Sequence, residues 1–171
     1  MRMSSIEAVG ASQIRRLVPG DWSALRQVRL AALADAPYAF SSTLEREAGL
    51  DERRWRQRIA SSAYFMAWLD GEPAGLAAGF LDDDLGAAWQ LGAMWVSPTA
   101  RGRGLADGLV EAVCACALEN GAARVVLWVT DVNARAQAFY RRLGFASNGT
   151  RQLVRPQEPD HWEEQMERQL G

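Results

Sequence analysis

The order of apolar and polar positions along the chain predicts strands and helices in alternation. Runs rich in apolar, β-branched or aromatic residues, bounded by turn residues, predict strands at 13–18, 63–70, 73–84, 88–98, 124–130 and from 145 onward. Helical spacing and capping residues predict helices from Asp21, from Asp51 to about Ile59, over 103–120 and over 133–144. The segment 36–49 has the composition of a loop, and the segment 162–170 fits a strand or a helix equally well.

This order of elements predicts the fold class. Strand, helix, strand, helix and strand follow one another over 89–154, with a hairpin before them, which indicates an α/β protein built on a mixed sheet with helices on both faces. A chain of 171 residues is most economically one domain, 1–171, and we expect about residues 1–11 to form a loose N-terminal arm.

Composition and charge exclude several classes of function. The formal net charge is −2, so nothing indicates general affinity for nucleic acid or for an anionic membrane. All 19 basic residues are arginine, as the printed sequence contains no lysine. A lysine Schiff base and the lysine of a phosphate-binding P-loop are thereby excluded.

Cysteine and histidine usage argues against a metal centre. Cys114 and Cys116 lie two apart in a predicted helix, so they point to different faces and are expected to be small buried residues in a reducing compartment. One histidine, His161, and no cysteine cluster make a zinc site an unfavourable hypothesis. The N-terminus lacks a signal-peptide core, and no apolar run approaches the roughly 18 residues of a membrane span. We therefore expect a cytoplasmic protein without a metal.

The glycine-rich stretch between the fourth strand and its following helix is a candidate anion site. Gly102 and Gly104 permit left-handed backbone and close approach of a ligand, and the helix that follows offers unpaired N–H groups and a positive dipole end. Arg101 and Arg103 add charge. The alternative is a plain helix start with solvated arginines. A Rossmann fingerprint fits poorly because the third glycine, Gly108, is displaced.

Two segments together resemble the GNAT N-acetyltransferase superfamily over about residues 91–145. In "RGRGLADGLV", Arg101, Gly104 and Ala106 occupy the fixed positions of the family's cofactor motif, Q/R-x-x-G-x-G/A. In "VTDVNARAQAFYRRLGF", an asparagine opens a helix that carries the family's aromatic–tyrosine pair at 139–140 and ends in Leu-Gly-Phe.

This resemblance implies a fold, a donor and an acceptor. It implies a mostly antiparallel mixed sheet whose one parallel strand pair splays open, with acetyl-CoA as cosubstrate and a primary amine of a small molecule or peptide as acceptor. The residues that it assigns to the cofactor are Met94, Trp95, Val96, Arg101, Gly102, Arg103, Gly104, Leu105, Ala106, Asn133 and Tyr140.

The same resemblance implies catalytic roles for a few residues. Tyr140 occupies the position of the family's general acid. Many members carry a glutamate on the strand before the cofactor loop, whereas this strand has no acidic residue. Glu45 and Glu47, in the predicted loop that borders the acceptor site in the family, are candidates for a base acting through water. Tyr38 and Phe40 are candidates for the acceptor wall or for simple packing.

Two other functions stay open at this stage. The missing strand carboxylate favours a non-catalytic acyl-CoA-binding or sensing module on the same fold as the alternative to an acetyltransferase. A nucleotide-binding domain requires that the glycine loop prefers ATP or NAD. Members of the family are often dimers, and a homodimer stays open because no exposed seam in the sequence predicts one.

Overall fold

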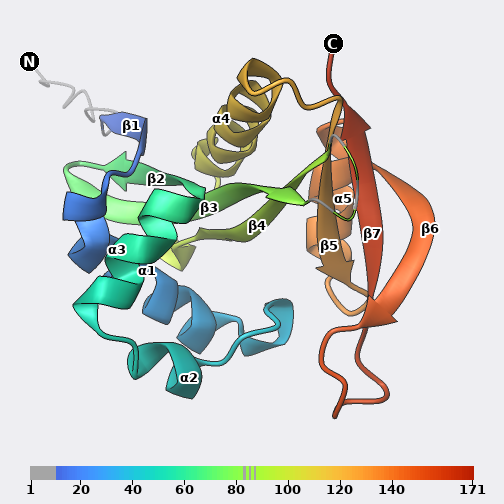
Figure 1. Ribbon diagram of the computed structural model, residues 1–171, viewed down its shortest axis with the longest axis horizontal. Helices are drawn as coiled ribbons and strands as arrows, with labels where there is room; N and C mark the ends of the chain where they lie inside the picture. Colours follow the sequence, from blue (N-terminus) through green and yellow to red (C-terminus); the bar gives the residue numbers. More distant parts are fainter. Residues whose placement is uncertain (1–10, 83, 85, 87) are drawn as a thin grey trace, which may run out of the picture.

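The computed structural model of the chain describes residues 11–82, 84, 86 and 88–171. All but the last residue of the expected N-terminal arm, 1–11, lies outside the described residues. The described part forms one seven-stranded sheet with helices on both faces (Figure 1), which confirms the predicted fold class.

The sheet has the strand order β1-β2-β3-β4-β5-β7-β6. Its strands are β1 Ser12–Arg16, β2 Ala63–Leu69, β3 Glu72–Asp82, β4 Ala88–Val96, β5 Arg124–Thr130, β6 Ala146–Leu153 and β7 Trp162–Gln169. Neighbouring strands are antiparallel except for β4 and β5, which are parallel. The sequence therefore predicted the hairpin of β2 and β3 and the strands β1, β4, β5 and β6, and the open choice for 162–170 resolves to a strand.

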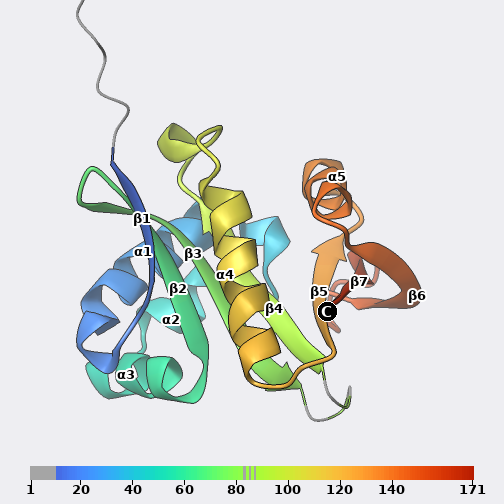
Figure 2. The same cartoon turned by 90° about the horizontal axis from the view of Figure 1, so that it is seen from above.

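Five α-helices and three short 3₁₀ turns occur in the described part of the chain. The helices are α1 Trp22–Asp35, α2 Leu44–Ala48, α3 Glu52–Ser61, α4 Leu105–Glu119 and α5 Ala134–Arg142, and the turns are η1 Pro19–Asp21, η2 Pro37–Ala39 and η4 Pro98–Ala100. Helices α1–α3 cover one face of the β1–β4 part and α4 covers the other (Figures 1 and 2). An ion pair of 2.7 Å between Arg142 and Asp107 ties α5 to α4.

Apolar side chains on each side of the sheet hold these layers together. On the α4 side, Leu109, Val110 and Val113 are fully buried against the strands, and the same cluster includes Tyr140 and Phe145 beyond β5. On the other side, Leu25 and Trp55 pack onto β2 and β3. Cys114 and Cys116 are buried free thiols of α4, as expected for small core residues.

Two local predictions require correction. The segment 36–49 is no plain loop, because it contains η2 and α2, and the hydroxyl of Thr43 caps α2 by accepting the Arg46 N–H at 3.3 Å. Asp21 does lie at the N-cap position of α1, but its carboxylate makes no capping bond there. It accepts the Val18 N–H and pairs with Arg15 instead, since the η1 turn brings both within 2.9 Å.

The parallel pair β4–β5 opens partway along its length. Its register runs only from Ala88 opposite Arg124 to Leu91 opposite Leu127. Just beyond this point, β4 carries a bulge, in which Ala93 and Met94 lie opposite the single residue Ala77 of β3. Ala93 has a φ of 53°, an uncommon conformation for a residue with a side chain. The bulge bends β4 away from β5, as Figure 1 shows for the two halves of the sheet.

No helix in the described part of the chain combines the length and the apolar character that crossing a membrane requires.

The bulge supports a test of backbone strain. Replacing Ala93 by glycine should raise the free energy of unfolding by up to about 1 kcal/mol, because left-handed backbone costs a non-glycine residue about 1–2 kcal/mol and the added chain entropy offsets part of the gain. Ala93→Val should lower it, since a β-branched residue is disfavoured there. Urea denaturation measures the free energy of unfolding of both variants. A glycine variant less stable than wild type would contradict backbone strain at Ala93.

Candidate functional site

Two neighbouring cavities occupy the opening between β4 and β5. The larger, of about 770 Å³, faces α1–α3, and the smaller, of about 390 Å³, faces the start of α4. Both are lined by Ala39, Phe40, Met94, Asn133, Ala136 and Tyr140. The last ladder residues, Leu91 and Leu127, line the larger cavity, so the site lies where the parallel pair stops pairing.

The smaller cavity is bounded by the glycine-rich loop. Gly102 and Gly104 have φ values of 78° and 76°, and a Cβ built at either position would meet nothing within 4 Å. Gly104 is the N-cap residue of α4, so the loop leads directly into the first turn of a 15-residue helix with its unpaired N–H groups. The loop has the backbone conformation and open space that an anion requires.

The predicted cofactor residues line this smaller cavity with one exception. Those that do are Met94, Trp95, Val96, Arg101, Gly102, Gly104, Leu105, Ala106, Asn133 and Tyr140. Arg103 is exposed and does not contribute to the wall.

Arg101 has structural partners that its sequence position did not reveal. Its Nε donates to the carbonyl oxygen of Val96 at 3.0 Å, and its Nη2 donates to Asp35 at 2.9 Å. The indole N–H of Trp95 also donates to Asp35 at 2.9 Å, and both contacts lower the pKa of that carboxyl. The Arg101 side chain thus ties the glycine loop and β4 to the end of α1.

Tyr140 and Asn133 lie at the junction of the two cavities. The Asn133 side chain accepts the Ala136 N–H at 3.1 Å and so caps α5, which carries Tyr140 about two turns later. The ring of Tyr140 packs edge-on against Phe139 and Phe145, with ring centroids 5.1 and 5.8 Å away. Burial raises the pKa of the Tyr140 hydroxyl, which therefore stays protonated through the neutral range.

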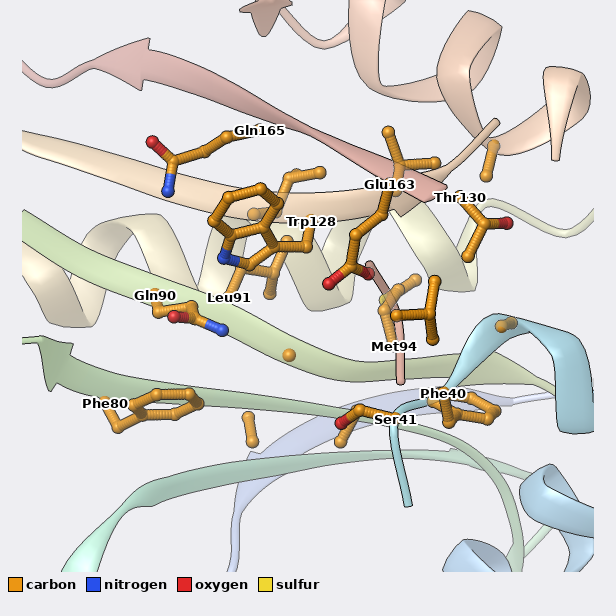
Figure 3. Close-up of a pocket in the computed structure, with 18 of the residues that line it drawn as sticks. Phe40, Ser41, Phe80, Gln90, Leu91, Met94, Trp128, Thr130, Glu163 and Gln165 are labelled. Atoms are coloured by element: carbon orange, nitrogen blue, oxygen red, sulfur yellow. The ribbon is translucent and has the colours of Figure 1, made fainter. Parts of the chain in front are cut away.

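Aromatic and sulfur-containing side chains line much of the larger cavity. Figure 3 shows Phe40 and Phe80 on one side and Trp128 on the other, with Met94 between them. Phe40 is held by the guanidinium of Arg29, which lies 4.7 Å from its ring centroid. Tyr38 is half exposed and lines the smaller cavity only. Of the two predicted acceptor residues, Phe40 alone reaches the larger cavity.

The two candidate bases from the α2 segment lie in different surroundings. Glu45 is exposed and lines neither cavity. Glu47 lines the larger cavity and is only 1% exposed, and its carboxylate accepts hydrogen bonds of 2.8–3.0 Å from Arg29 and Arg58. Burial alone would raise the pKa of Glu47, but the two guanidinium groups outweigh it and lower the pKa. Glu47 is an anchor that joins α1, α2 and α3.

A second buried carboxylate, which the sequence analysis missed, projects into the larger cavity from β7. Glu163 is 8% exposed, and Figure 3 shows its carboxylate directed toward the side of the cavity formed by Met94. Gln165, two residues further along β7, lines the same cavity and is also a buried polar residue. The available signal was the alternation of "WEEQMERQL", because a strand would place Glu163 and Gln165 on one face.

Polar pairing across three strands holds Glu163 in place. In register it lies opposite Thr130 of β5 and Gln152 of β6. The Gln152 side-chain amide donates to Glu163 Oε1 at 2.7 Å. Burial raises the pKa of Glu163, and the Gln152 hydrogen bond and the charge of His161 offset this only in part. The larger cavity therefore contains one buried glutamate neutralised by arginines and another that, within the described residues, forms no ion pair.

No group of three or more histidine, cysteine, aspartate or glutamate residues within the described ranges is arranged to hold a metal ion.

Comparisons with known proteins agree on one family. Residues 26–145 match the family model described as the acetyltransferase (GNAT) family. An uncharacterised N-acetyltransferase of Mycobacterium bovis is 36% identical over 107 residues, which cover 61% of this chain and 67% of that protein.

Two further likenesses extend over more of the chain. The mycothiol acetyltransferase of Streptomyces avermitilis is 31% identical over 145 residues, and the match spans 83% of this chain but only 45% of that longer protein. The structure of YncA, a putative acetyltransferase of Salmonella typhimurium with its cofactor acetyl-CoA, superposes with a TM-score of 0.77 at 17% identity, covering 94% of this chain and 95% of the other. The latter likeness establishes the fold.

The ion cluster of Glu47, Arg29 and Arg58 allows a test of whether Glu47 holds the fold together or acts as a base. Glu47→Gln should lower the free energy of unfolding by about 3–5 kcal/mol, because it leaves two partly buried guanidinium groups without their counter-charge. Glu45→Gln, two residues away and exposed, is the matched control and should stay within about 0.5 kcal/mol of wild type. Chemical denaturation at neutral pH measures both.

The same cluster predicts how its contribution depends on pH. Since the pKa of Glu47 is lowered in the folded state, its stabilisation is present above the ordinary glutamate value of 4.5 and is lost as pH falls below it. The difference in free energy of unfolding between wild type and Glu47→Gln should therefore become smaller at acidic pH. A difference that stays constant with pH would contradict a stabilising role of the ion cluster.

Proposed function

Because the chain belongs to the acetyltransferase (GNAT) family, we propose that it transfers the acetyl group of acetyl-CoA to a primary amine. The acceptor is a small molecule or a peptide terminus, and attack is direct, with both substrates bound together. The observation that carries this proposal is the meeting of two cavities at Met94, Asn133 and Tyr140. One cavity suits an anionic donor, and the other is large enough for an amine.

The donor side of the proposal rests on the glycine loop. The pyrophosphate of acetyl-CoA would be held by backbone N–H groups over 101–106 and by the dipole of α4, as two left-handed glycines leave these groups open to approach. Asn133 and the β4 stretch 94–96 border the same cavity and would hold the rest of the cosubstrate. The thioester supplies the activated acetyl group.

The acceptor side must solve a protonation problem. An alkyl amine with a pKa near 10.4 is charged at pH 7, and deprotonating it costs roughly 4–5 kcal/mol at about 1.4 kcal/mol per pH unit. The larger cavity offers aromatic faces that attract a cation and carboxylates that accept a proton. We place the amine in this cavity.

Tyr140 is proposed as the general acid. Tyr140 lines both cavities, and burial keeps its hydroxyl protonated at neutral pH. A neutral phenol can give its proton to the departing thiolate sulfur and receive one from the nitrogen of the collapsing intermediate. The balance leaves the tyrosine unchanged after each turnover.

A non-catalytic acyl-CoA-binding module is the second candidate. The absence of an acidic residue from β4, over 88–96, favours it, because many family members place their base there. Such a module would bind acetyl-CoA and transfer nothing to any amine.

Thermal unfolding with acetyl-CoA, CoA, ATP and NAD tests the donor site. Ligand at 100 times its dissociation constant stabilises by about 2.7 kcal/mol. For this chain length we expect a rise in Tm of roughly 5–10 °C with acetyl-CoA or CoA. Gly104→Glu should abolish the rise, because it puts a negative side chain at the anion site.

Gly149→Glu is the matched control for that substitution. Gly149 has a φ of 84°, and like Gly104 it has nothing within 4 Å of an added Cβ, but it lies in β6 away from both cavities. Gly149→Glu therefore introduces the same charge as Gly104→Glu and a similar backbone strain. A shift with ATP or NAD but not with CoA would contradict the donor assignment.

Tyr140→Phe tests the acid. We expect kcat to fall by about 10²-fold or more, since the variant cannot protonate the leaving thiolate. The acetyl-CoA-induced rise in Tm should persist, because the ring and its edge-on contacts are retained. A steady-state assay of the two products, CoA and the acetylated amine, measures kcat. Full activity of the variant would contradict the role of Tyr140 as general acid.

A further inference from the structure

We propose that Glu163 of β7 is the catalytic base, binding the acceptor's ammonium group and taking its proton from the larger cavity. This inference rests on the proposed function and adds to it the residue that stands in for the missing acid of β4. A strand on the far side of the parallel opening, β7, would supply the group that β4 lacks.

The geometry of Glu163 carries the inference. Its side chain is buried and projects across the opening toward the β4 bulge, as Figure 3 shows with Met94 directly opposite. In the described part of the chain, its Oε1 accepts one hydrogen bond, from Gln152, and its Oε2 accepts none. The carboxylate therefore has lone pairs available to a ligand and a neighbour that fixes its orientation.

Other carboxylates of the site are less suited to this task. Glu47 accepts hydrogen bonds from two guanidinium groups, which hold its charge and leave little basicity. Glu45 lines neither cavity. Asp82 and Asp84 border the larger cavity at the far end of β3, and in the β3–β4 register Phe80 and Gln90 lie between Asp82 and the bulge. Glu163 alone of these joins burial with free hydrogen-bonding capacity.

The charges around Glu163 keep it basic without neutralising it. The titratable and polar groups that face the cavity from other elements are Tyr140 of α5, Gln152 of β6 and, across the cavity, Arg29 of α1, Glu47 of α2, Arg58 of α3, Tyr64 of β2, Asp82 of β3 and Asp84. His161, before β7, is not part of the cavity lining, but its charge opposes the raised pKa of Glu163. Arg29 and Arg58 are paired with Glu47, and His161 is bonded to Glu158 through its Nδ1 at 2.9 Å. The charge of an entering ammonium is therefore the strongest new partner for Glu163.

The proton balance of the step is simple. The ammonium nitrogen gives one proton to Glu163, which becomes a carboxylic acid, and the neutral amine attacks the acetyl carbon. The nitrogen loses its second proton when the carbon–sulfur bond breaks, and Tyr140 relays that proton to the sulfur. Glu163 returns its proton to solvent after the acetylated product leaves.

The side chains nearest to Glu163 also indicate the kind of amine. Trp128 and Met94 flank its carboxylate in Figure 3, so the carbon next to the amine meets apolar surface. The geometry points to a primary amine on an apolar or aromatic stem, rather than to an amine flanked by a carboxylate.

Glu163→Gln tests the inference with three acceptors, tyramine, spermidine and the tripeptide Ala-Gly-Ala. For acceptors that the wild type acetylates, we expect kcat/KM of the variant to fall about 10²–10⁴-fold. The acidic limb of the wild-type pH profile should lie above the ordinary glutamate range and should disappear in the variant. The acetyl-CoA-induced rise in Tm should be unchanged.

Glu164→Gln is the matched control. Glu164 is the next residue of β7, lines neither cavity and lies 3.7 Å from Arg141 on the outer face. It should keep wild-type kinetics. A Glu163→Gln variant within about threefold of wild type, with the same acidic limb, would overturn the assignment while leaving acetyl transfer intact.

A stability measurement keeps the inference testable without any acceptor. Burial raises the pKa of Glu163 above the ordinary glutamate value of 4.5. The charged form therefore destabilises the folded protein as pH rises above 4.5, and the destabilisation reaches its full size once pH exceeds the raised pKa. Glu163→Gln should therefore be more stable than wild type at pH 8, with the difference vanishing near pH 4. A merely structural glutamate would lose both stability and activity on substitution.

The two readouts separate the possible failures. If the wild type binds acetyl-CoA but acetylates none of the three amines, the proposed function is contradicted for this class of acceptor. The free energies of unfolding of the wild type and Glu163→Gln then test Glu163 without an acceptor. If both proteins show the same dependence of this free energy on pH, the assignment of Glu163 as a buried base is overturned.

Discussion

The short parallel ladder between β4 and β5 is the constraint on which the rest of the structure depends. It runs from Ala88 opposite Arg124 to Leu91 opposite Leu127 and no further. Backbone N–H and C=O groups beyond that point face an opening, and buried groups of this kind need partners. The bulge at Ala93, the helix caps at Gly104 and Asn133 and both cavities are all arranged around those few residues. A sheet that paired over its whole length would have no site.

Two buried glutamates on different sides of the larger cavity differ in their electrostatic surroundings. Glu47 receives two guanidinium groups and is fixed as a charge, whereas Glu163 receives one amide and stays basic. The difference arises from tertiary contacts, since α1 and α3 both bring an arginine to Glu47. The same residue type thus stabilises the fold at one position and, in our proposal, reacts at the other.

Local sequence signals were sufficient for most elements. Glycines at 102 and 104, the asparagine at 133 and the apolar run of β5 shape the chain within a few residues, so local patterns and the family resemblance together pointed to the segments that line the smaller cavity. The arrangement of the larger cavity depends on contacts that a local pattern does not predict. Arg29 of α1 pairs with Glu47 of α2, and Gln152 of β6 donates to Glu163 of β7. The burial of Glu163 further depended on β7 being a strand, which its charged sequence left open.

The ion pairs that hold this fold together have one more property in common. Those at Glu47, Asp35, Asp107 and Glu111 all use guanidinium groups, and the 19 basic residues of the sequence include no lysine. A lysine amine is a nucleophile toward a thioester, whereas an arginine stays charged and does not react under the same conditions. Under the proposed function, the acetyl thioester would therefore lie beside a framework of cations that it cannot acetylate.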